Sequence, residues 1–212
     1  MRAFALIDKP RGITSFDVVA RVRRVVHERS VGHTGTLDPM ATGLLIVAIG
    51  EATKLVPLFE HDDKTYEAEV LLGVTTDTGD ADGRITAELP VPALTPARLD
   101  EIRTAFSGDI LQVPPMFSAL KQGGRRLYEL AREGKEVERA PRPVTVRRLD
   151  ITVLGADRLG LFAQVSKGTY IRTLATDIGE SLGSGAHLVS LRRLSAGYDN
   201  VQGRHGQDRD AG

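Results

Sequence analysis

Residues 32–45 read Gly-His-Thr-Gly-Thr-Leu-Asp-Pro-Met-Ala-Thr-Gly-Leu-Leu, a polar, glycine-rich loop that leads into an apolar run. Glycines at such short spacing allow backbone dihedrals that side chains forbid, or a close approach by another molecule. Pro39 keeps Asp38 out of the helical region and places its carboxylate on a stiff, extended support. The run 44–49 is rich in branched residues and ends at Gly50, which predicts a buried strand. Such a loop suits a catalytic group, but the pattern fits equally an Asp-Pro turn in which Asp38 only caps its own backbone.

The composition is that of a globular chain with no overall charge. With 212 residues, of which 41% are hydrophobic, the chain can form one sizeable domain with its own core. Its 28 basic and 28 acidic residues balance, so any contact with nucleic acid must come from the arrangement of charge. The absence of cysteine excludes disulfides and thiolate chemistry. Because the N-terminal apolar stretch is too short for a signal peptide and no run reaches membrane-spanning length, we expect a cytoplasmic protein without a membrane partner.

The periodicity of apolar residues predicts an α/β chain in which strands and helices are mixed. A strand at 4–8 and a Pro-Gly turn precede a helix that Thr14 or Ser15 can cap. Its apolar face comprises Val18, Val19, Val22, Val25 and Val26. Its arginines, at positions 21, 23 and 24, form either a solvated face or a surface that contacts phosphate. Further elements are predicted at 51–59 (helix), 64–72 (alternating strand), 95–107 and 127–132 (helices), 143–154 with 159–166 (a hairpin) and 177–182 (helix).

Taken as a whole, the run 32–45 resembles the signature loop of the TruB family of tRNA pseudouridine synthases. The resemblance implies the pseudouridine synthase fold, an α/β (α+β) arrangement with a mixed, mainly antiparallel central sheet flanked by helices. It implies that Asp38 is the nucleophilic aspartate that isomerises uridine to pseudouridine at position 55, in the T-loop of tRNA. No cofactor and no metal are expected for this reaction. His33 would fill the space that the flipped base leaves, although a lone histidine is more often structural.

Three other segments match motifs of the same family. The turn Lys9-Pro10-Arg11-Gly12 matches the opening motif, which places Lys9 near the active site. Lys64-Thr65-Tyr66 before an alternating strand is similar to the second motif, whose tyrosine stacks on the flipped base; without the resemblance, Tyr66 would be a packing residue. The loop 73–83 matches a segment in which the aspartate at the place of Asp80 pairs with an arginine. Its aspartate spacing is not that of a calcium loop.

The segment Gly168-Thr169-Tyr170-Ile171-Arg172 contains two further candidate catalytic residues, Tyr170 and Arg172. Tyr170 and Arg172 stand two residues apart, so on extended backbone both side chains would point to the same side. The resemblance implies that Arg172 pairs with Asp38 and that Tyr170 is the base that removes the C5 proton. It further implies that Leu191, in the segment Ala-His-Leu-Val-Ser-Leu-Arg-Arg, packs beside the target base. We expect a cleft in which the Asp38 loop, Tyr66 and the Tyr170–Arg172 pair meet.

Residues 113–142 form a basic stretch interrupted by prolines and glycines. Over 121–148 the basic residues outnumber the acidic ones roughly two to one, which suits contact with a phosphate backbone. The stretch resembles the insertion with which the family clasps the T-arm of tRNA, and Lys121, Arg125 and Arg126 are its candidate contacts. The motifs end near Ser195. We therefore expect a catalytic domain at 1–195, a polar and disordered tail at 196–212, no C-terminal PUA domain, and a monomer.

The resemblance leaves the detailed mechanism open. Asp38 can attack C1′, attack the base, or remove a ribose proton, and each route needs an ionised carboxylate. The same residues leave two other functions open to comparison. A tRNA-folding chaperone would share the fold and the basic stretch, but the presence of Asp38, Tyr66, Tyr170 and Arg172 favours catalysis. Phosphoryl transfer through an aspartyl phosphate is disfavoured, because the aspartate follows the Thr-Gly-Thr and no convincing carboxylate cluster would bind a metal.

Overall fold

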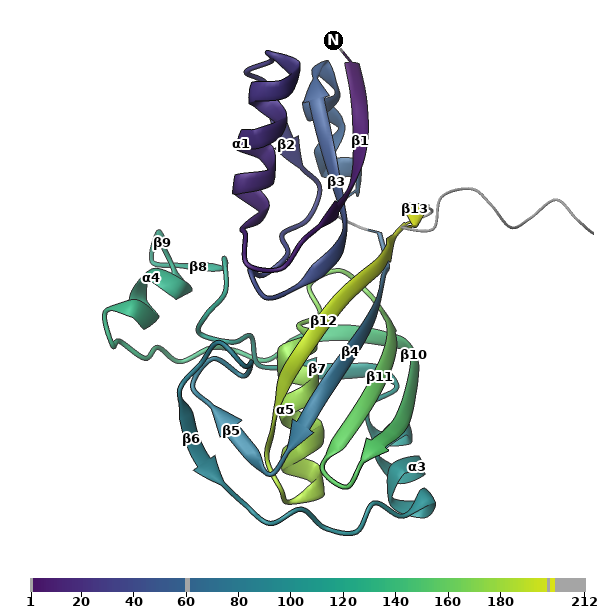
Figure 1. Cartoon of the computed structure of the whole chain (residues 1–212). Coiled ribbons are helices and arrows are strands. Elements are labelled where there is room, and N and C mark those ends of the chain that lie inside the picture. The colour runs from purple at the N-terminus through teal and green to yellow at the C-terminus, as the bar shows by residue number, and fades with distance from the viewer. Residues whose placement is uncertain (1, 60–61, 198, 201–212) are drawn as a thin grey trace, which may run out of the picture. The chain divides into compact units, whose positions relative to one another are not determined.

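The computed structural model describes residues 2–59, 62–197 and 199–200, and the chain divides into two compact units (Figure 1). Unit 1 comprises Met1–Glu67 and Leu191–Gly212, and unit 2 comprises Ala68–Ser190. Strands β4 (Lys64–Leu72) and β12 (Ala186–Ala196) each begin in one unit and end in the other. Within the described ranges, no helix is long and apolar enough to cross a membrane.

Unit 1 is built on an antiparallel strand pair. β1 (Arg2–Lys9) pairs with β3 (Thr42–Gly50) along its full length, and β2 (Val31–His33) also pairs antiparallel with β3. The start of β3 is parallel to β12 at Arg192 and Arg193. Residues 43–50 of β3 are buried, which confirms the predicted core strand. β3 leads into the 3-10 helix η1 (Glu51–Leu55) and then α2 (Val56–Phe59), where the sequence predicts one short helix.

Helix α1 (Ser15–Val26) contacts β2 and begins at a capping box (Figure 1). The Thr14 hydroxyl accepts from the Asp17 amide at 3.0 Å, and the Asp17 carboxylate accepts from the Thr14 amide at 2.8 Å. Val18 and Val19 are buried as predicted, but the prediction for Val25 is wrong, because its side chain is 76% exposed. Val25 lies at one edge of the apolar stripe in the last turn, where the helix ends.

The predicted hairpin forms the centre of unit 2. β10 (Arg142–Gly155) pairs antiparallel with β11 (Arg158–Val165) on one side and with β7 (Gly108–Gln112) on the other, while β11 neighbours β4. Alternate residues of β11 are buried, as are most residues of the helix α5 (Ile171–Leu182). α3 (Pro96–Ala105) begins after its N-cap Thr95. The mixed, mainly antiparallel sheet with flanking helices is the predicted fold class.

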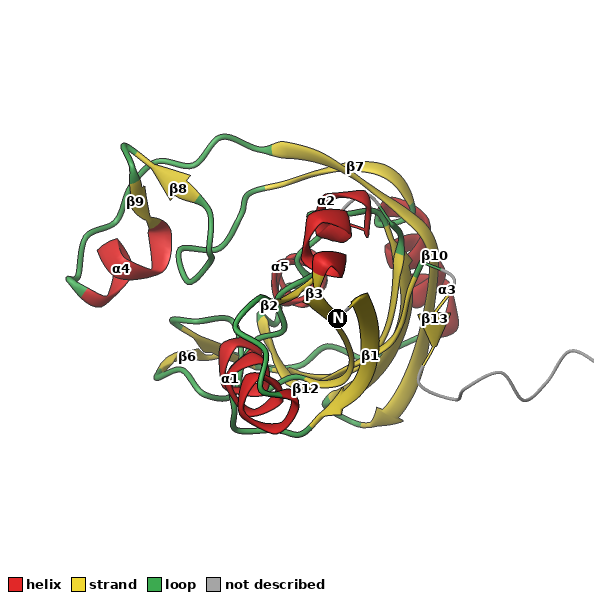
Figure 2. Ribbon diagram, turned by 90° about the horizontal axis from the view of Figure 1, so that it is seen from above, coloured by secondary structure: helices red, strands yellow, loops and turns green. Residues whose placement is uncertain are grey.

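Two smaller hairpins belong to unit 2. β5 (Val74–Thr76) and β6 (Ile85–Glu88) enclose the loop that carries Asp80. The insertion, residues 113–142, holds β8 (Lys121–Gln122), β9 (Arg125–Arg126) and α4 (Leu127–Arg132). In both ribbon views these three elements project away from β10 and β11 (Figures 1 and 2).

The end of unit 1 differs from the expected polar tail. β12 continues through Ala196, and β13 (Asp199–Asn200) pairs antiparallel with Ser195 and Ala196. Regular structure thus extends beyond the boundary at 195, because backbone pairing does not require an apolar sequence. The remainder of that expectation, on residues 198 and 201–212, lies outside the described residues.

Candidate active site

Asp38 is half-buried in the loop of residues 34–41 between β2 and β3, hereafter the Asp38 loop. The Leu37 amide donates to the Ser15 hydroxyl at 2.8 Å, and this hydroxyl donates to the Leu37 carbonyl at 3.1 Å. Ser15 is 3% exposed and is the first residue of α1. On the other side of the aspartate, the Ala41 amide donates to the Asp38 carbonyl at 3.0 Å. The main chain on both sides of Asp38 is therefore fixed by hydrogen bonds.

Lys9 supports the same loop from the end of β1. Its side chain is fully buried, and its ammonium group donates to the Pro39 carbonyl at 3.3 Å, to the Ile13 carbonyl at 2.7 Å and to the Pro10 carbonyl at 3.1 Å. Burial lowers the pKa of Lys9, and the nearby Asp38 carboxylate opposes that shift. In this conformation the three ammonium protons serve main-chain carbonyls, so Lys9 braces the residue after Asp38; its contact with substrate stays a prediction.

His33 lies at the end of β2, directly before the Asp38 loop. Burial, with a smaller contribution from Arg193, lowers the pKa of its imidazole from the ordinary value, so the ring is neutral at pH 7. Its Nδ1 atom is buried and has no hydrogen-bond partner among residues 2–59, 62–197 and 199–200. The ring is therefore not held by a hydrogen bond at that atom.

Tyr66 and Leu191, the two residues expected beside the target base, both belong to unit 1. Tyr66 lies on the buried face of β4 and is 8% exposed, and Leu191 on β12 is 7% exposed. The Leu191 carbonyl accepts from the Thr42 hydroxyl at 3.4 Å, next to the Asp38 loop. The alternation predicted for β4 is confirmed, with Tyr66 on its inner face together with Ala68 and Val70.

Arg172 in unit 2 is buried, and its guanidinium contacts Asp80, Thr78 and Phe117. Its Nε atom lies 3.6 Å from the Asp80 carboxylate, its Nη1 donates to the Thr78 carbonyl at 3.0 Å, and its Nη2 donates to the Phe117 carbonyl at 2.7 Å. Asp80 is therefore paired with an arginine, as the resemblance implies. The guanidinium joins the loop between β5 and β6 to the start of the insertion, so its orientation is fixed within unit 2.

The Asp80 carboxylate is itself fixed by its own loop. Its Oδ1 atom accepts from the Thr78 hydroxyl at 2.6 Å and from the Asp82 amide at 3.2 Å. The loop is tied to β12, because the Leu188 amide donates to the Gly79 carbonyl at 3.0 Å. These hydrogen bonds hold the Asp80 carboxylate in place beside the Arg172 guanidinium.

Tyr170 is the N-cap of α5, and Gln112 holds its main chain. The Tyr170 amide donates to the Gln112 side-chain oxygen at 3.0 Å, and the Gln112 side-chain nitrogen donates to the Tyr170 carbonyl at 3.3 Å. Gln112, at the end of β7, is 2% exposed, and sequence patterns gave no signal for this role. The argument that Tyr170 and Arg172 share one side of extended backbone is wrong, because the helix begins at Ile171 and Arg172 lies in its first turn.

The insertion presents its basic residues on the surface. Lys121, Arg125 and Arg126 are all exposed. Arg125 forms an ion pair with Glu133, which also accepts from Lys135 at 2.9 Å. These two cations lower the pKa of the Glu133 carboxyl to about 2, with the Arg125 hydrogen bond as the largest cause. Part of the positive charge of the insertion is therefore balanced internally.

Residues 23–171 match the model described as TruB family pseudouridylate synthase (N terminal domain). The chain belongs to the TruB family. A second model, tRNA pseudouridylate synthase B C-terminal domain, matches residues 172–202. The family likeness thus continues past Ser195, where the sequence motifs alone placed its end, because a family model weighs every position and not only short motifs.

Curated relatives of this TruB-family chain are bacterial proteins named tRNA pseudouridine synthase B. One from Dechloromonas aromatica (strain RCB) is 53% identical over 192 residues, which cover 91% of this chain and 64% of the relative. Another from Azoarcus sp. (strain BH72) is 52% identical over 192 residues, with the same coverage of 91% and 64%. The chain thus spans just under two thirds of the length of these relatives.

Solved structures confirm the pseudouridine synthase fold. The crystal structure of a Cbf5-Nop10-Gar1 complex matches with a TM-score of 0.71 and 29% identity, over 92% of this chain and 50% of that one. An H/ACA RNP bound to a substrate RNA containing 2′-deoxyuridine matches with a TM-score of 0.66 and 27% identity, over 92% of this chain and 47% of that one.

Proposed function

We propose that this TruB-family chain isomerises uridine to pseudouridine in the T-loop of tRNA. The observation that carries the proposal is the Asp38 loop, where the family signature and the geometry agree. The aspartate is mounted between Leu37, held by a buried hydroxyl, and Pro39, held by a buried ammonium group. Preorganised mounting of this kind is what a group that must meet a reacting atom requires.

The reaction breaks the bond between N1 of the base and C1′ and forms a bond between C5 and C1′ after the base has turned. The proton lost from C5 is matched by a proton gained at N1, so no redox partner or hydrolytic water is consumed. Asp38 acts as the anionic nucleophile, and the family resemblance supports Arg172 as the cation that pairs with it. Tyr170 accepts the C5 proton, and the two hydrogen bonds with the Gln112 side chain keep the Tyr170 main chain in place.

Access to the uridine requires base flipping, because the base is stacked within the folded RNA. Unstacking costs a few kcal/mol, which contact with aromatic and apolar side chains offsets. Tyr66 and Leu191 provide these contacts, and the neutral ring of His33 enters the space that the base leaves. The exposed residues Lys121 and Arg126 of the insertion bind phosphates of the T-arm.

Tritium release from a tRNA transcript labelled at C5 of uridine tests the proposal. Wild-type chain should release tritium, and Asp38→Asn should bind the same transcript without release. Binding by the wild-type chain without any release would overturn the catalytic proposal and favour a tRNA-folding chaperone. Release by Asp38→Asn at the wild-type rate would overturn the role of Asp38.

A further inference from the structure

Arg193, near the end of β12, is a fully internal arginine that the motifs left without a role. Its side chain is among the largest buried ones and is 2% exposed. Every hydrogen bond found for its guanidinium goes to a main-chain carbonyl: Nε donates to Leu44 at 2.7 Å, Nη2 to Gly35 at 3.1 Å and Nη1 to Thr36 at 3.4 Å. Two acceptors precede Asp38 in the chain and one follows it. A single planar group thus joins both ends of the segment that carries the aspartate.

The backbone of Arg193 also lies against this segment. Arg193 is the partner of Gly43 in the parallel pairing of β12 with β3. Gly43 has a φ of +98°, and a Cβ atom there would lie 2.2 Å from the Arg193 carbonyl oxygen. Only glycine permits this approach. Both the side chain and the main chain of Arg193 are therefore fitted to the segment from Gly35 to Leu44.

The charge of Arg193 acts on the same site. The guanidinium contributes to lowering the pKa of His33, which directly precedes the Asp38 loop, and the pKa of Lys9, which holds the Pro39 carbonyl of that loop. Lys9 holds the Pro39 carbonyl from β1, while Arg193 holds the carbonyls of Gly35 and Thr36 from β12. The loop is thus fixed by two buried cations from different strands.

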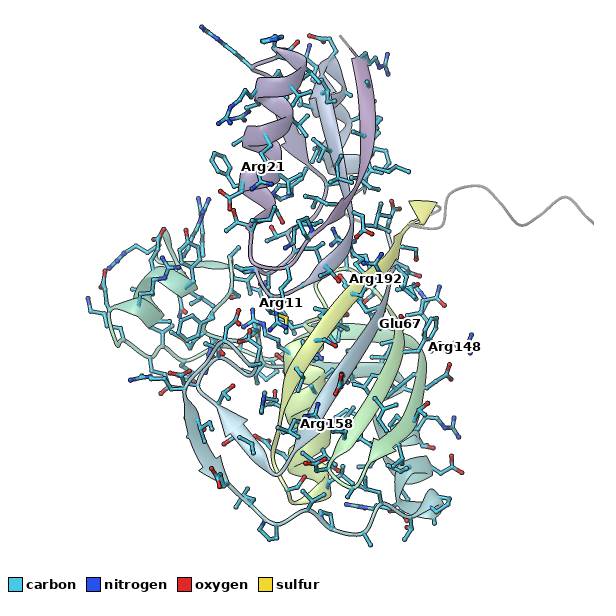
Figure 3. All side chains as sticks on the ribbon, viewed as in Figure 1. Arg11, Arg21, Glu67, Arg148, Arg158 and Arg192 are labelled. Atoms are coloured by element: carbon cyan, nitrogen blue, oxygen red, sulfur yellow. The ribbon has the colours of Figure 1, made fainter. Side chains whose placement is uncertain are left out.

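The side chain of the neighbouring Arg192 differs from that of Arg193, although its main chain also pairs with β3, at Thr42. Its side chain is 38% exposed and forms a surface ion pair with Asp8, in which Nη1 donates to Oδ1 at 3.0 Å and Nη2 donates to Oδ2 at 2.7 Å. Figure 3 labels Arg192 near the end of β12. The same residue type, one position earlier on the same strand, therefore provides a matched control.

We propose that Arg193 is the positioning residue of the Asp38 loop: its guanidinium sets the path of the main chain on both sides of the aspartate, so that the carboxylate is presented in one orientation. The inference rests on the proposed function, because it assigns Arg193 to the catalytic role of Asp38. Arg193 acts through main-chain carbonyls and does not touch the RNA. Its loss should therefore lower the rate of the bound complex and leave RNA affinity unchanged.

The test compares Arg193→Lys with Arg192→Lys, because lysine keeps the positive charge but cannot span three carbonyls with a planar fork. The measurements are the single-turnover rate of tritium release, the Kd for the tRNA transcript, and the thermal unfolding curve. Arg193→Lys should lower the single-turnover rate about 100-fold, the loss expected for misplacement of a reacting group by about 1 Å, with the Kd within about threefold of wild type. Arg192→Lys should change neither.

The outcomes separate this inference from the function on which it rests. If wild-type chain releases tritium and folded Arg193→Lys does so at the same rate, the positioning role is wrong while the proposed function stands. If Arg193→Lys is unfolded at every temperature at which wild type is folded, Arg193 is required for folding and the positioning role is likewise overturned. A rise in Kd that accounts for the whole loss of activity would assign Arg193 to RNA binding instead. No tritium release by wild type would overturn the proposed function itself.

Discussion

The Asp38 loop and the insertion, residues 113–142, are both irregular segments, yet they are held in opposite ways. The Asp38 loop is fixed from inside, by buried side chains of Lys9, Ser15 and Arg193 that bind its main chain. The insertion is anchored at its start by Arg172, but its basic part is held by exposed ion pairs such as Arg125 with Glu133. Buried hydrogen bonds to main chain are costly to break, whereas exposed ion pairs contribute little and weaken with salt. The difference suits one segment to chemistry and the other to an adaptable, salt-dependent contact with RNA.

The largest effect is expected from Gly43→Ala. The positive φ of Gly43 and the 2.2 Å approach of the Arg193 carbonyl oxygen leave no room for a Cβ atom. We expect the free energy of unfolding to fall by about 3 kcal/mol or more, and activity to be lost. Gly124→Ala in the insertion is the control, since Gly124 also has a positive φ but no atom within 4 Å of an added Cβ. Thermal and urea unfolding give the free energy of unfolding of both variants. An equal loss of stability in the two variants would contradict the contrast between the two segments.

Ser15→Ala should loosen the Asp38 loop without removing any catalytic group. The Leu37 amide would lose its buried acceptor, which costs about 1–3 kcal/mol, and the single-turnover rate should fall about 10-fold. Thr14→Ala is the matched control, because it removes a hydroxyl that caps the helix through Asp17, at a cost of about 1 kcal/mol. Comparable loss of rate in both variants would show that stability of α1, and not position of the loop, is what matters.

In the insertion, replacement of Lys121 and Arg126 together by alanine should affect binding and not chemistry. We expect the Kd for tRNA to rise about 10-fold at low salt, and the slope of log K against log salt to shrink by about two, one for each lost phosphate contact. Filter binding at several salt concentrations measures both quantities. Lys54→Ala, on the exposed surface of η1, removes one positive charge outside the insertion and is the control for the loss of surface charge alone. A changed single-turnover rate at saturating protein would argue that the insertion does more than bind.

The smallest effect, and one of opposite sign, is expected from Glu133→Gln. Arg125 and Lys135 are both paired with this carboxylate, so its neutralisation frees two cations for phosphate. The Kd for tRNA should fall about two- to threefold at low salt, with no gain at high salt because the effect is electrostatic. Glu101→Gln, in α3, removes one surface carboxylate outside the insertion and should change the Kd less. Weaker binding by Glu133→Gln would show that its ion pairs instead shape the contact surface.

Local patterns were sufficient for several elements of the fold, whereas the strands β2, β7 and β12 were not predicted. The alternation in β4, the apolar run of β3 and the cap at Thr14 each gave the correct element, because these signals depend on neighbouring residues alone. The predicted burial of Val25 and the predicted shared side of Tyr170 and Arg172 are wrong. Each depended on where a helix begins or ends, which the local pattern did not determine. The family motifs supplied the identity of the candidate site, which no periodicity could have indicated.

The polar side chains that hold the main chain of the candidate site could not be predicted from the sequence. Ser15 looked like a helix cap, yet its hydroxyl binds Leu37, 22 residues away. Arg193 follows a surface arginine and carries no local sign of burial, and its acceptors lie about 150 residues away, Leu44 being separated from it by 149 positions. Gln112 meets Tyr170 across 58 positions. Each is a polar side chain whose role is defined by a distant main-chain group, so only the folded chain reveals it.

The central claim is that Asp38 is the catalytic carboxylate of a uridine isomerase, and tritium release at single turnover tests it most directly. Wild-type chain and Asp38→Asn are each mixed in excess with a tRNA transcript tritiated at C5 of uridine, after filter binding has shown that both bind it. The account predicts release by the wild type and a rate at least about 1,000-fold lower for Asp38→Asn, as expected when a nucleophile is removed. Equal release by the two proteins would contradict the account.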